Sequence, residues 1–221
     1  MKVFFACAAC LMLSAGLAGA EWNENFDSYA SGSLIIGQGG WAGWDDNPAW
    51  DAIVSADQAQ SAPNSVAITP TSDIVHQFTG IAGGLWTMSG YCYIPTGSSG
   101  HQYFILLNTY NHGGPYSWSV QLRFNSTTGM MNVMEGSGST PIVNDQWTKV
   151  EIHINLDENQ QTIYYNGIQL DTIPWTTSGA MEIGAIDLFS DMGSTIYWDD
   201  LSLEPGAALT PSTWGQIKAT W

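Results

Sequence analysis

The sequence has very few basic residues. Its 221 residues include 4 Lys and Arg against 20 Asp and Glu, which gives a formal net charge of -16 at pH 7. Because phosphate binding needs clustered Lys and Arg, this balance argues against nucleic acid as a partner. It also disfavours electrostatic docking on anionic lipid. Since 44% of the residues are hydrophobic, the chain can bury a core and is not a disordered acidic tail.

Long hydrophobic runs are missing beyond the first twenty residues. Lys2 precedes a short apolar run over 3–13, and Ala18-Gly19-Ala20 has the small residues of a cleavage site. The run is shorter than the roughly 18–20 residues that a membrane span needs. We therefore predict a signal peptide over 1–20 and a protein that is secreted, extracellular or on the cell surface, without membrane insertion. Cleavage would remove Lys2 and leave three bases against 20 acids, a net charge of -17.

Cysteine is also scarce. Cys7 and Cys10 fall in the predicted signal peptide, so Cys92 would remain alone. A single cysteine cannot form an intramolecular disulfide, and this one lies in a strand-like stretch, so we expect a buried, unreactive thiol. Stability must therefore come from packing, helped at most by a metal.

A sustained helical period is absent, and alternation of apolar and polar residues takes its place. It is clearest over 118–124 and 149–156, and it predicts strands with one face in a core and one face in water. The continuous apolar run over 103–107 fits a strand buried on both sides, and Asn166-Gly167 predicts a type I′ hairpin. Trp118 and Trp147 are assigned to the core. The other candidate strands are 65–68, 74–78, 85–88, 129–134, 162–165, 181–183, 186–189 and 195–203.

About a dozen short strands indicate an all-β, two-sheet antiparallel sandwich. The segments Trp147–Asp157 and Thr162–Gly167 resemble the concanavalin A-like (laminin-G-like) jelly roll of secreted bacterial proteins, as do an opening segment at 25–44 and a closing one at 196–203. The resemblance implies one jelly-roll domain over 21–204. Residues 205–221 would form a linker and a short C-terminal tail that either docks on another surface protein or folds back on the sandwich.

The resemblance also implies a structural calcium ion. Related sandwiches hold Ca²⁺ between the first strand and an Asp of the last strand. The matching ligands here would be Glu24 or Asp27 at the front and Asp199 or Asp200 at the back. Ca²⁺ takes six to eight oxygen ligands, which two adjoining chain ends can supply. The alternative is that Asp199 and Asp200 are simply exposed at a strand end.

Paired catalytic carboxylates of the usual spacing are absent. Sandwich-fold glucanases take two acids from positions two residues apart on one strand, and no two of the 20 acids here have that spacing. Acids from different strands could still meet. A polysaccharide lyase is the better enzymatic alternative, with Gln121 and Arg123 on one polar strand face and Glu151 and His153 on another, provided that the two strands are neighbours.

Aromatic residues are plentiful where loops are expected. Flat aromatic rings stack on the apolar faces of sugars, whose hydroxyl groups take amide and carboxylate partners. We therefore predict a non-catalytic, lectin-like module that binds a polysaccharide or other glycan. The competing classes are a groove enzyme (lyase or hydrolase) and a structural or adhesion module of the cell surface. The candidate ligand-binding residues, of which one or more tryptophans could instead be buried, are Trp41, Trp44, Trp50, Tyr110, His112 and Tyr116.

Overall fold

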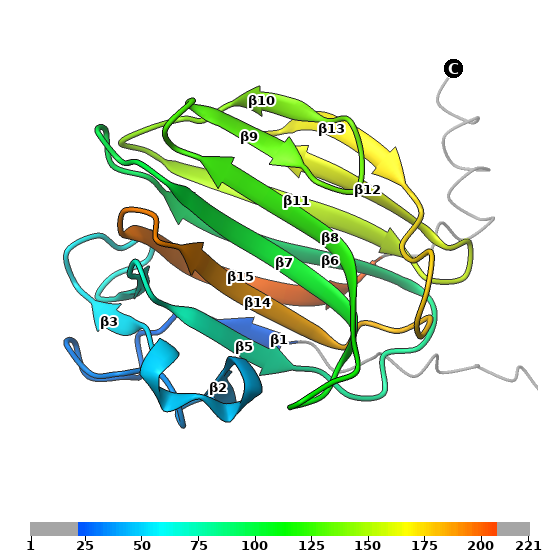
Figure 1. The fold of residues 1–221 in the computed structure, drawn as a ribbon, viewed down its shortest axis with the longest axis horizontal. Helices are drawn as coiled ribbons and strands as arrows, with labels where there is room; N and C mark the ends of the chain where they lie inside the picture. The colour runs from blue at the N-terminus through cyan, green and yellow to red at the C-terminus, as the bar shows by residue number, and fades with distance from the viewer. Residues whose placement is uncertain (1–21, 207–221) are drawn as a thin grey trace, which may run out of the picture.

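A computed structural model describes residues 22–206 as two antiparallel sheets stacked face to face (Figure 1). The predicted signal peptide and all of the predicted tail from residue 207 onward lie outside this range, so both stay predictions. Within the range, none of the helices has the length and apolar character needed to cross a membrane.

One sheet has eight strands in the order β13-β12-β11-β6-β15-β4-β3, with β1 paired to β15 beside β4. All of its pairings are antiparallel. Its strands are β1 (Trp22–Glu24), β3 (Ile53–Ser55), β4 (Ser65–Ile68), β6 (Leu85–Tyr93), β11 (Trp147–Asn155), β12 (Gln160–Tyr165), β13 (Ile168–Ile173) and β15 (Ile196–Pro205).

The other sheet has seven strands in the order β10-β9-β8-β7-β14-β5-β2. Two short 3-10 helices, η1 (Trp44–Asp46) and η2 (Pro48–Trp50), follow β2 at one end of this sheet (Figure 1). Its strands are β2 (Trp41–Gly43), β5 (Asp73–Gln77), β7 (His101–Tyr110), β8 (Tyr116–Asn125), β9 (Met130–Val133), β10 (Ser139–Pro141) and β14 (Ala185–Asp191).

The structure confirms the predicted two-sheet jelly roll of the concanavalin A-like type. Asn166 and Gly167 have φ values of 51° and 72°, as the type I′ turn between β12 and β13 requires. Among the predicted strands, only 181–183 is a loop, although the side chain of Ile183 is buried. Its apolar character therefore reflects burial under the sheets and not strand pairing.

The main core lies between the two sheets. Trp198 of β15 packs on Phe104 of β7, with ring centroids 4.9 Å apart, and both side chains are fully buried. Cys92 is buried in this core as well, and burial raises the pKa of its thiol well above the ordinary value. The prediction of a buried thiol is confirmed, and the raised pKa agrees with low reactivity.

A second, smaller apolar cluster covers the outer face of the seven-stranded sheet. Side chains alternate along β7, so Phe104 and Leu106 enter the main core while Ile105 and Leu107 point the other way. Ile105 and Leu107 are nevertheless buried, because half-buried aromatic side chains pack over them. The run 103–107 is thus buried on both sides, as predicted, and the outer face of this sheet is not an ordinary wet surface.

Candidate functional site

The second apolar cluster borders a groove on the outer face of the seven-stranded sheet. The groove has a volume of about 350 Å³. Its lining combines aromatic rings from η1, β8 and β14 with polar side chains from β5, β8 and β14. The lining residues are Trp44, Asp73, Ile105, Tyr116, Trp118, Gln121, Asp187 and Phe189.

Strand register explains why these residues meet. Asp187 on β14 lies opposite Ile105 on β7, and Ile105 in turn lies opposite Gln121 on β8. Directly opposed residues point to the same side of a sheet, so the three form a row across its outer face. In the adjacent row, Asp73 on β5 lies opposite Phe189 on β14. The groove floor is therefore fixed by three antiparallel pairings among rigid strands.

Aromatic rings form one side of the groove. The rings of Trp44 and Trp118 are nearly parallel, at 10° with centroids 6.3 Å apart, and Tyr116 lies 4.8 Å from Trp44. Trp118 is 43% exposed, so one of the largest apolar side chains of the protein is in contact with water. A flat ring exposed beside polar groups can stack on the apolar face of a ligand.

Two carboxyl groups meet at the groove floor. Asp187 is 2% exposed and Asp73 is half-buried, and the Oδ1 atom of each is buried without a hydrogen-bond donor. Burial raises the pKa of Asp73 to about 6, and burial together with the charge of Asp73 raises the pKa of Asp187 well above its ordinary value. Asp187 therefore keeps its proton and donates it in a hydrogen bond to the Asp73 carboxylate.

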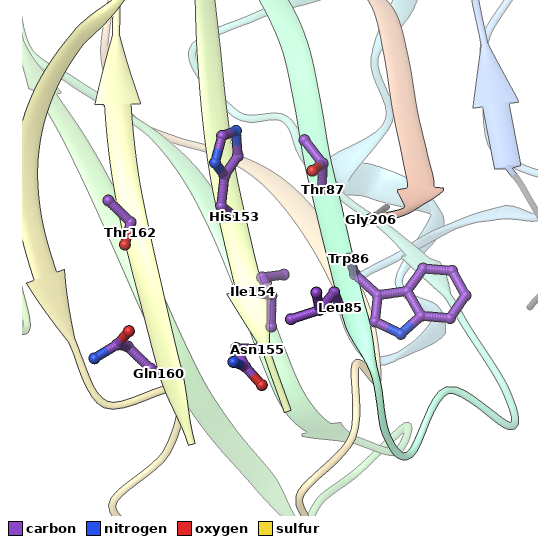
Figure 2. Close-up of a pocket in the computed structure, with 9 residues that line it drawn as sticks. All are labelled: Leu85, Trp86, Thr87, His153, Ile154, Asn155, Gln160, Thr162 and Gly206. Carbon is purple, nitrogen blue, oxygen red and sulfur yellow. The ribbon is translucent and has the colours of Figure 1, made fainter. Parts of the chain in front are cut away.

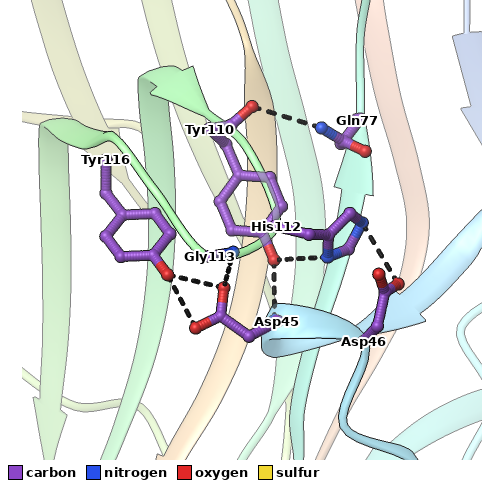
Figure 3. Close-up of polar contacts among 7 residues, drawn as sticks. All are labelled: Asp45, Asp46, Gln77, Tyr110, His112, Gly113 and Tyr116. Atoms are coloured by element: carbon purple, nitrogen blue, oxygen red, sulfur yellow. Dashed lines mark hydrogen bonds and ion pairs between the residues drawn. The ribbon is translucent and has the colours of Figure 1, made fainter.

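A polar network holds the rim of the groove (Figure 3). Both carboxylate oxygens of Asp45 accept from the Tyr116 hydroxyl at 2.6 Å, and Oδ1 also accepts from the Gly113 N–H at 2.8 Å. These bonds, that of Tyr116 first, hold the pKa of Asp45 below its ordinary value. The Asp45 N–H donates to the Tyr110 hydroxyl, which lies 3.2 Å from Nδ1 of His112. Loop residues far apart in sequence thus fix the orientation of Tyr116.

The predicted aromatic loop cluster is brought together only in part. Trp44, Tyr110, His112 and Tyr116 do meet at the rim. Trp41 does not join them: it is 2% exposed and packs in the main core, with its ring 5.6 Å from that of His76. Its assignment as a ligand contact is therefore wrong.

Trp50 and Tyr110 lie away from the groove lining. Trp50 is half-buried in η2, and Tyr110 is 5% exposed. The ring of Tyr110 packs against that of Trp44, with centroids 4.7 Å apart. Tyr110 therefore helps to position Trp44 and has no ring face exposed to a ligand.

Trp118 and Trp147, both assigned to the core from sequence, are instead on outer faces. Ser119 is an extra residue at a β-bulge, because Val120 pairs with Leu106 and Trp118 pairs with Leu107. A bulge of one residue moves the side chains before it to the opposite face. Trp147 is half-buried on the other sheet, where its ring packs 5.6 Å from Tyr93.

The residues of the lyase alternative lie on different sheets. Gln121 and Arg123 are on β8 of the seven-stranded sheet, whereas Glu151 and His153 are on β11 of the eight-stranded sheet. The two pairs point outward from opposite faces of the sandwich. The two strands are therefore not neighbours, and the convergence that the lyase alternative requires does not occur. His153 lines a separate pocket of about 380 Å³ with Thr87 and Thr162 (Figure 2).

The four carboxylates of the predicted calcium site already have partners in the chain. Glu24 accepts from the Phe26 N–H and the Tyr29 hydroxyl, and Asp27 from the Asn64 N–H. Asp199 accepts from three backbone N–H groups, and Asp200 from the Ser61 hydroxyl. Within 22–206 no group of three or more His, Cys, Asp or Glu residues could hold a metal ion. The donor set does not favour calcium, which stays a prediction.

No protein-family model matches the chain, and neither does any of the curated proteins searched. Solved structures do share its fold. The chain is similar to a cellulose-induced protein, Cip1, at a TM-score of 0.54 and 15% identity, covering 85% of this chain and 98% of that one. It is similar to the carbohydrate-binding module CBM66 from Bacillus subtilis at 0.50 and 11%, covering 75% and 95%.

A sialidase also matches, at a TM-score of 0.57 and 11% identity, covering 85% of this chain but only 19% of that one. At these identities the likeness shows the fold, and the function has to be argued from the groove itself.

The two acids of the groove floor were not predicted from the sequence. Asp73 and Asp187 are 114 positions apart in sequence and on strands that pair only in the folded sheet. One available indication was the two-sided burial predicted for 103–107, because a strand buried on both sides must lie beneath something on its outer face.

Proposed function

We propose that this protein is a secreted, non-catalytic carbohydrate-binding module and that an extracellular or cell-surface glycan binds in the groove of the seven-stranded sheet. One observation carries the proposal: the exposed ring of Trp118 and the nearly parallel, half-buried ring of Trp44 border a floor of polar groups on rigid strands. Sugar rings stack their apolar C–H faces on such aromatics, while their hydroxyls bond to carboxylate and amide groups like Asp73 and Gln121.

The fold supports the same class of function. One structure with this sandwich is, by its name, a carbohydrate-binding module, and the similarity extends over 95% of its length. A domain of this kind needs no catalytic group, only a groove that is formed before the ligand arrives. Here the hydrogen bonds of Asp45 fix the aromatic rim in advance.

The spacing of the acids favours binding over hydrolysis. Glycosidases keep their two carboxyl groups about 5–5.5 Å apart when retaining and about 6.5–9.5 Å apart when inverting. Asp73 and Asp187 are hydrogen-bonded to each other, which leaves no room for a sugar carbon or a water between them. The lyase alternative has its four residues divided between opposite faces of the molecule.

The test is a glycan array followed by affinity electrophoresis of single-tryptophan variants. Trp118→Ala should weaken binding by at least about tenfold, because aromatic anchors dominate small binding sites. Trp147→Ala is the matched control, since it removes the same side chain from the outer face of the other sheet, and it should bind as the unaltered protein does.

Three outcomes contradict the proposal. Absence of binding to every glycan would favour a structural or adhesion module. Loss of binding in Trp147→Ala but not in Trp118→Ala would move the site to the other face. Ultraviolet absorbance that rises on incubation with a polysaccharide would indicate a lyase. Repeating the array with EDTA also tests the predicted calcium ion, whose removal should weaken binding if it stabilises the fold.

A further inference from the structure

The carboxyl groups that line the groove have no basic side chain among them; the nearest bases are Arg123, opposite Tyr103 in the adjacent row, and His112, which lies 3.3 Å from Asp46 at the rim. The lining includes Asp73 and Asp187 but no Lys, Arg or His. Two further acids are close by: Glu135 accepts from the amide nitrogen of Gln121 at 2.8 Å, and Asp45 accepts from Tyr116. The local charge thus has the same sign as the net charge of -16. An anionic sugar entering the groove would be repelled.

The negative charge at the floor also lacks a positive partner. Of the two carboxyls, Asp73 is half-buried and Asp187 is 2% exposed, so Asp73 is the group that a ligand in the groove can reach. No basic side chain within 22–206 forms an ion pair with either group. A partly buried charge without a counter-ion is costly, so a cation that reaches it gains more than it would on an open surface.

We propose that the groove selects a glycan with free primary amines, such as 2-amino-2-deoxyhexose units, and that one sugar ammonium pairs with the Asp73 carboxylate. This inference rests on the proposed function and names its ligand class. An ammonium offers three N–H donors together with the missing positive charge. The faces of Trp44 and Trp118 favour the same charge through cation–π attraction.

Asp187 acts as a positioning residue in this arrangement. Its carboxyl is 2% exposed and donates to Asp73, so it orients the charged group while keeping its own charge neutralised. An amide at position 187 can donate the same hydrogen bond and leaves the charge of Asp73 in place. An amide at position 73 removes the charge. The two isosteric variants are therefore expected to behave in opposite ways.

The experiment is calorimetric titration with a glucosamine tetramer and its fully N-acetylated counterpart, at about pH 6.5, where an amine with a pKa near that of an α-amino group, about 7.7–8.0, is mostly protonated. The two probes differ only at nitrogen. The unaltered protein should bind the free-amine tetramer at least about tenfold more tightly, a preference of about 1.4 kcal/mol. Asp73→Asn should abolish this preference, and Asp187→Asn should keep it.

Glu158→Gln is the control for non-specific attraction between an acidic protein and a cationic sugar. Glu158 is exposed on the turn between β11 and β12 and is not part of the groove lining, so its replacement changes the net charge equally without changing the groove, and the preference should persist. Thermal unfolding of each variant establishes that it is folded before titration.

Failure of this inference is distinguishable from failure of the proposed function. If the two tetramers bind equally, or if only glycans without amines bind, the amine selection is wrong while glycan binding stands. Preference that survives in Asp73→Asn, or disappears in Glu158→Gln, would equally overturn the role of Asp73. If neither tetramer and no glycan on the array binds, both proposals are wrong.

Discussion

The outer faces of the two sheets differ in how their polar groups are satisfied. On the eight-stranded sheet, Glu151 lies 3.0 Å from Lys149 and 3.1 Å from His153, and Thr162 bonds with Thr172 across the strands. On the seven-stranded sheet, no basic side chain within 22–206 forms an ion pair with Asp73 or Asp187, and the exposed ring of Trp118 stands beside them.

This difference separates a solvated surface from the surface that we propose as the binding site. Both faces have a pocket of similar volume, about 380 Å³ on the first and about 350 Å³ on the second, so size alone does not distinguish them. Over the described residues 22–206, only the face of the groove combines buried carboxyl oxygens that lack a hydrogen-bond donor, Oδ1 of Asp73 and of Asp187, with a large exposed ring, that of Trp118. Natural proteins seldom leave such groups unsatisfied unless function requires it.

The largest difference expected between the two faces is in stability. Ile105→Ala should lower the free energy of unfolding by about 2–5 kcal/mol, because Ile105 is buried even though it points away from the main core. Thr162→Ala, on the outer face of the other sheet, should cost less than about 1 kcal/mol. Urea unfolding measures both, and equal losses would show that the two faces are packed alike.

A smaller difference should appear when stability is measured against pH. The pKa of Asp73 is 3.8 ordinarily and about 6 in the fold, so between these values the folded chain holds a proton that the unfolded chain has released. Stability from this pair is complete below about pH 4 and is lost as the pH rises through 6, by at least about 2 kcal/mol. The negative charge of Asp45 also raises the pKa of Asp73.

The double variant Asp73→Asn, Asp187→Asn has no carboxyl at the groove floor and isolates this effect. The stability of the unaltered protein relative to the double variant should fall between pH 4 and pH 7. Urea unfolding at several pH values provides the comparison. A constant difference would mean that the two carboxyls do not share a proton.

The rim network predicts a smaller, local change. Tyr116→Phe removes the hydroxyl that donates to Asp45, so the pKa of Asp45 should rise toward its ordinary value. A carboxyl-detected NMR titration measures this. Asp145, whose pKa is held low by hydrogen bonds from Thr96 instead, should not change and serves as the internal control.

The smallest effect is expected on the solvated face. His153→Ala should change stability by less than about 0.5 kcal/mol and leave glycan binding intact, because exposed ion pairs contribute little. A large loss of glycan binding in this variant would indicate that the pocket of the eight-stranded sheet is the binding site and that His153 contributes to it.

The sequence predicted the fold well because alternation and turn chemistry are local. The hairpin at Asn166-Gly167 and the strand at 149–156 needed no knowledge of the rest of the chain. The site was less predictable because it depends on pairing between distant strands. Trp118 was assigned to the wrong face because the bulge at Ser119 shifts the alternation by one residue. The residues around Ser119 contain no signal for this bulge. Trp44 and Tyr116 were predicted as ligand contacts because Gly-rich loops rarely need large rings, and both lie in the groove lining.

The most direct test of the account is to map a bound glycan by NMR, using an oligosaccharide that is positive on the array. Amide and indole N–H shifts should change at Trp44, Trp118, Gln121 and Phe189, and saturation transfer should link the sugar to the indole of Trp118. Changes confined to Thr87, His153 and Thr162, on the opposite face, would contradict the central claim that the groove of the seven-stranded sheet is the binding site.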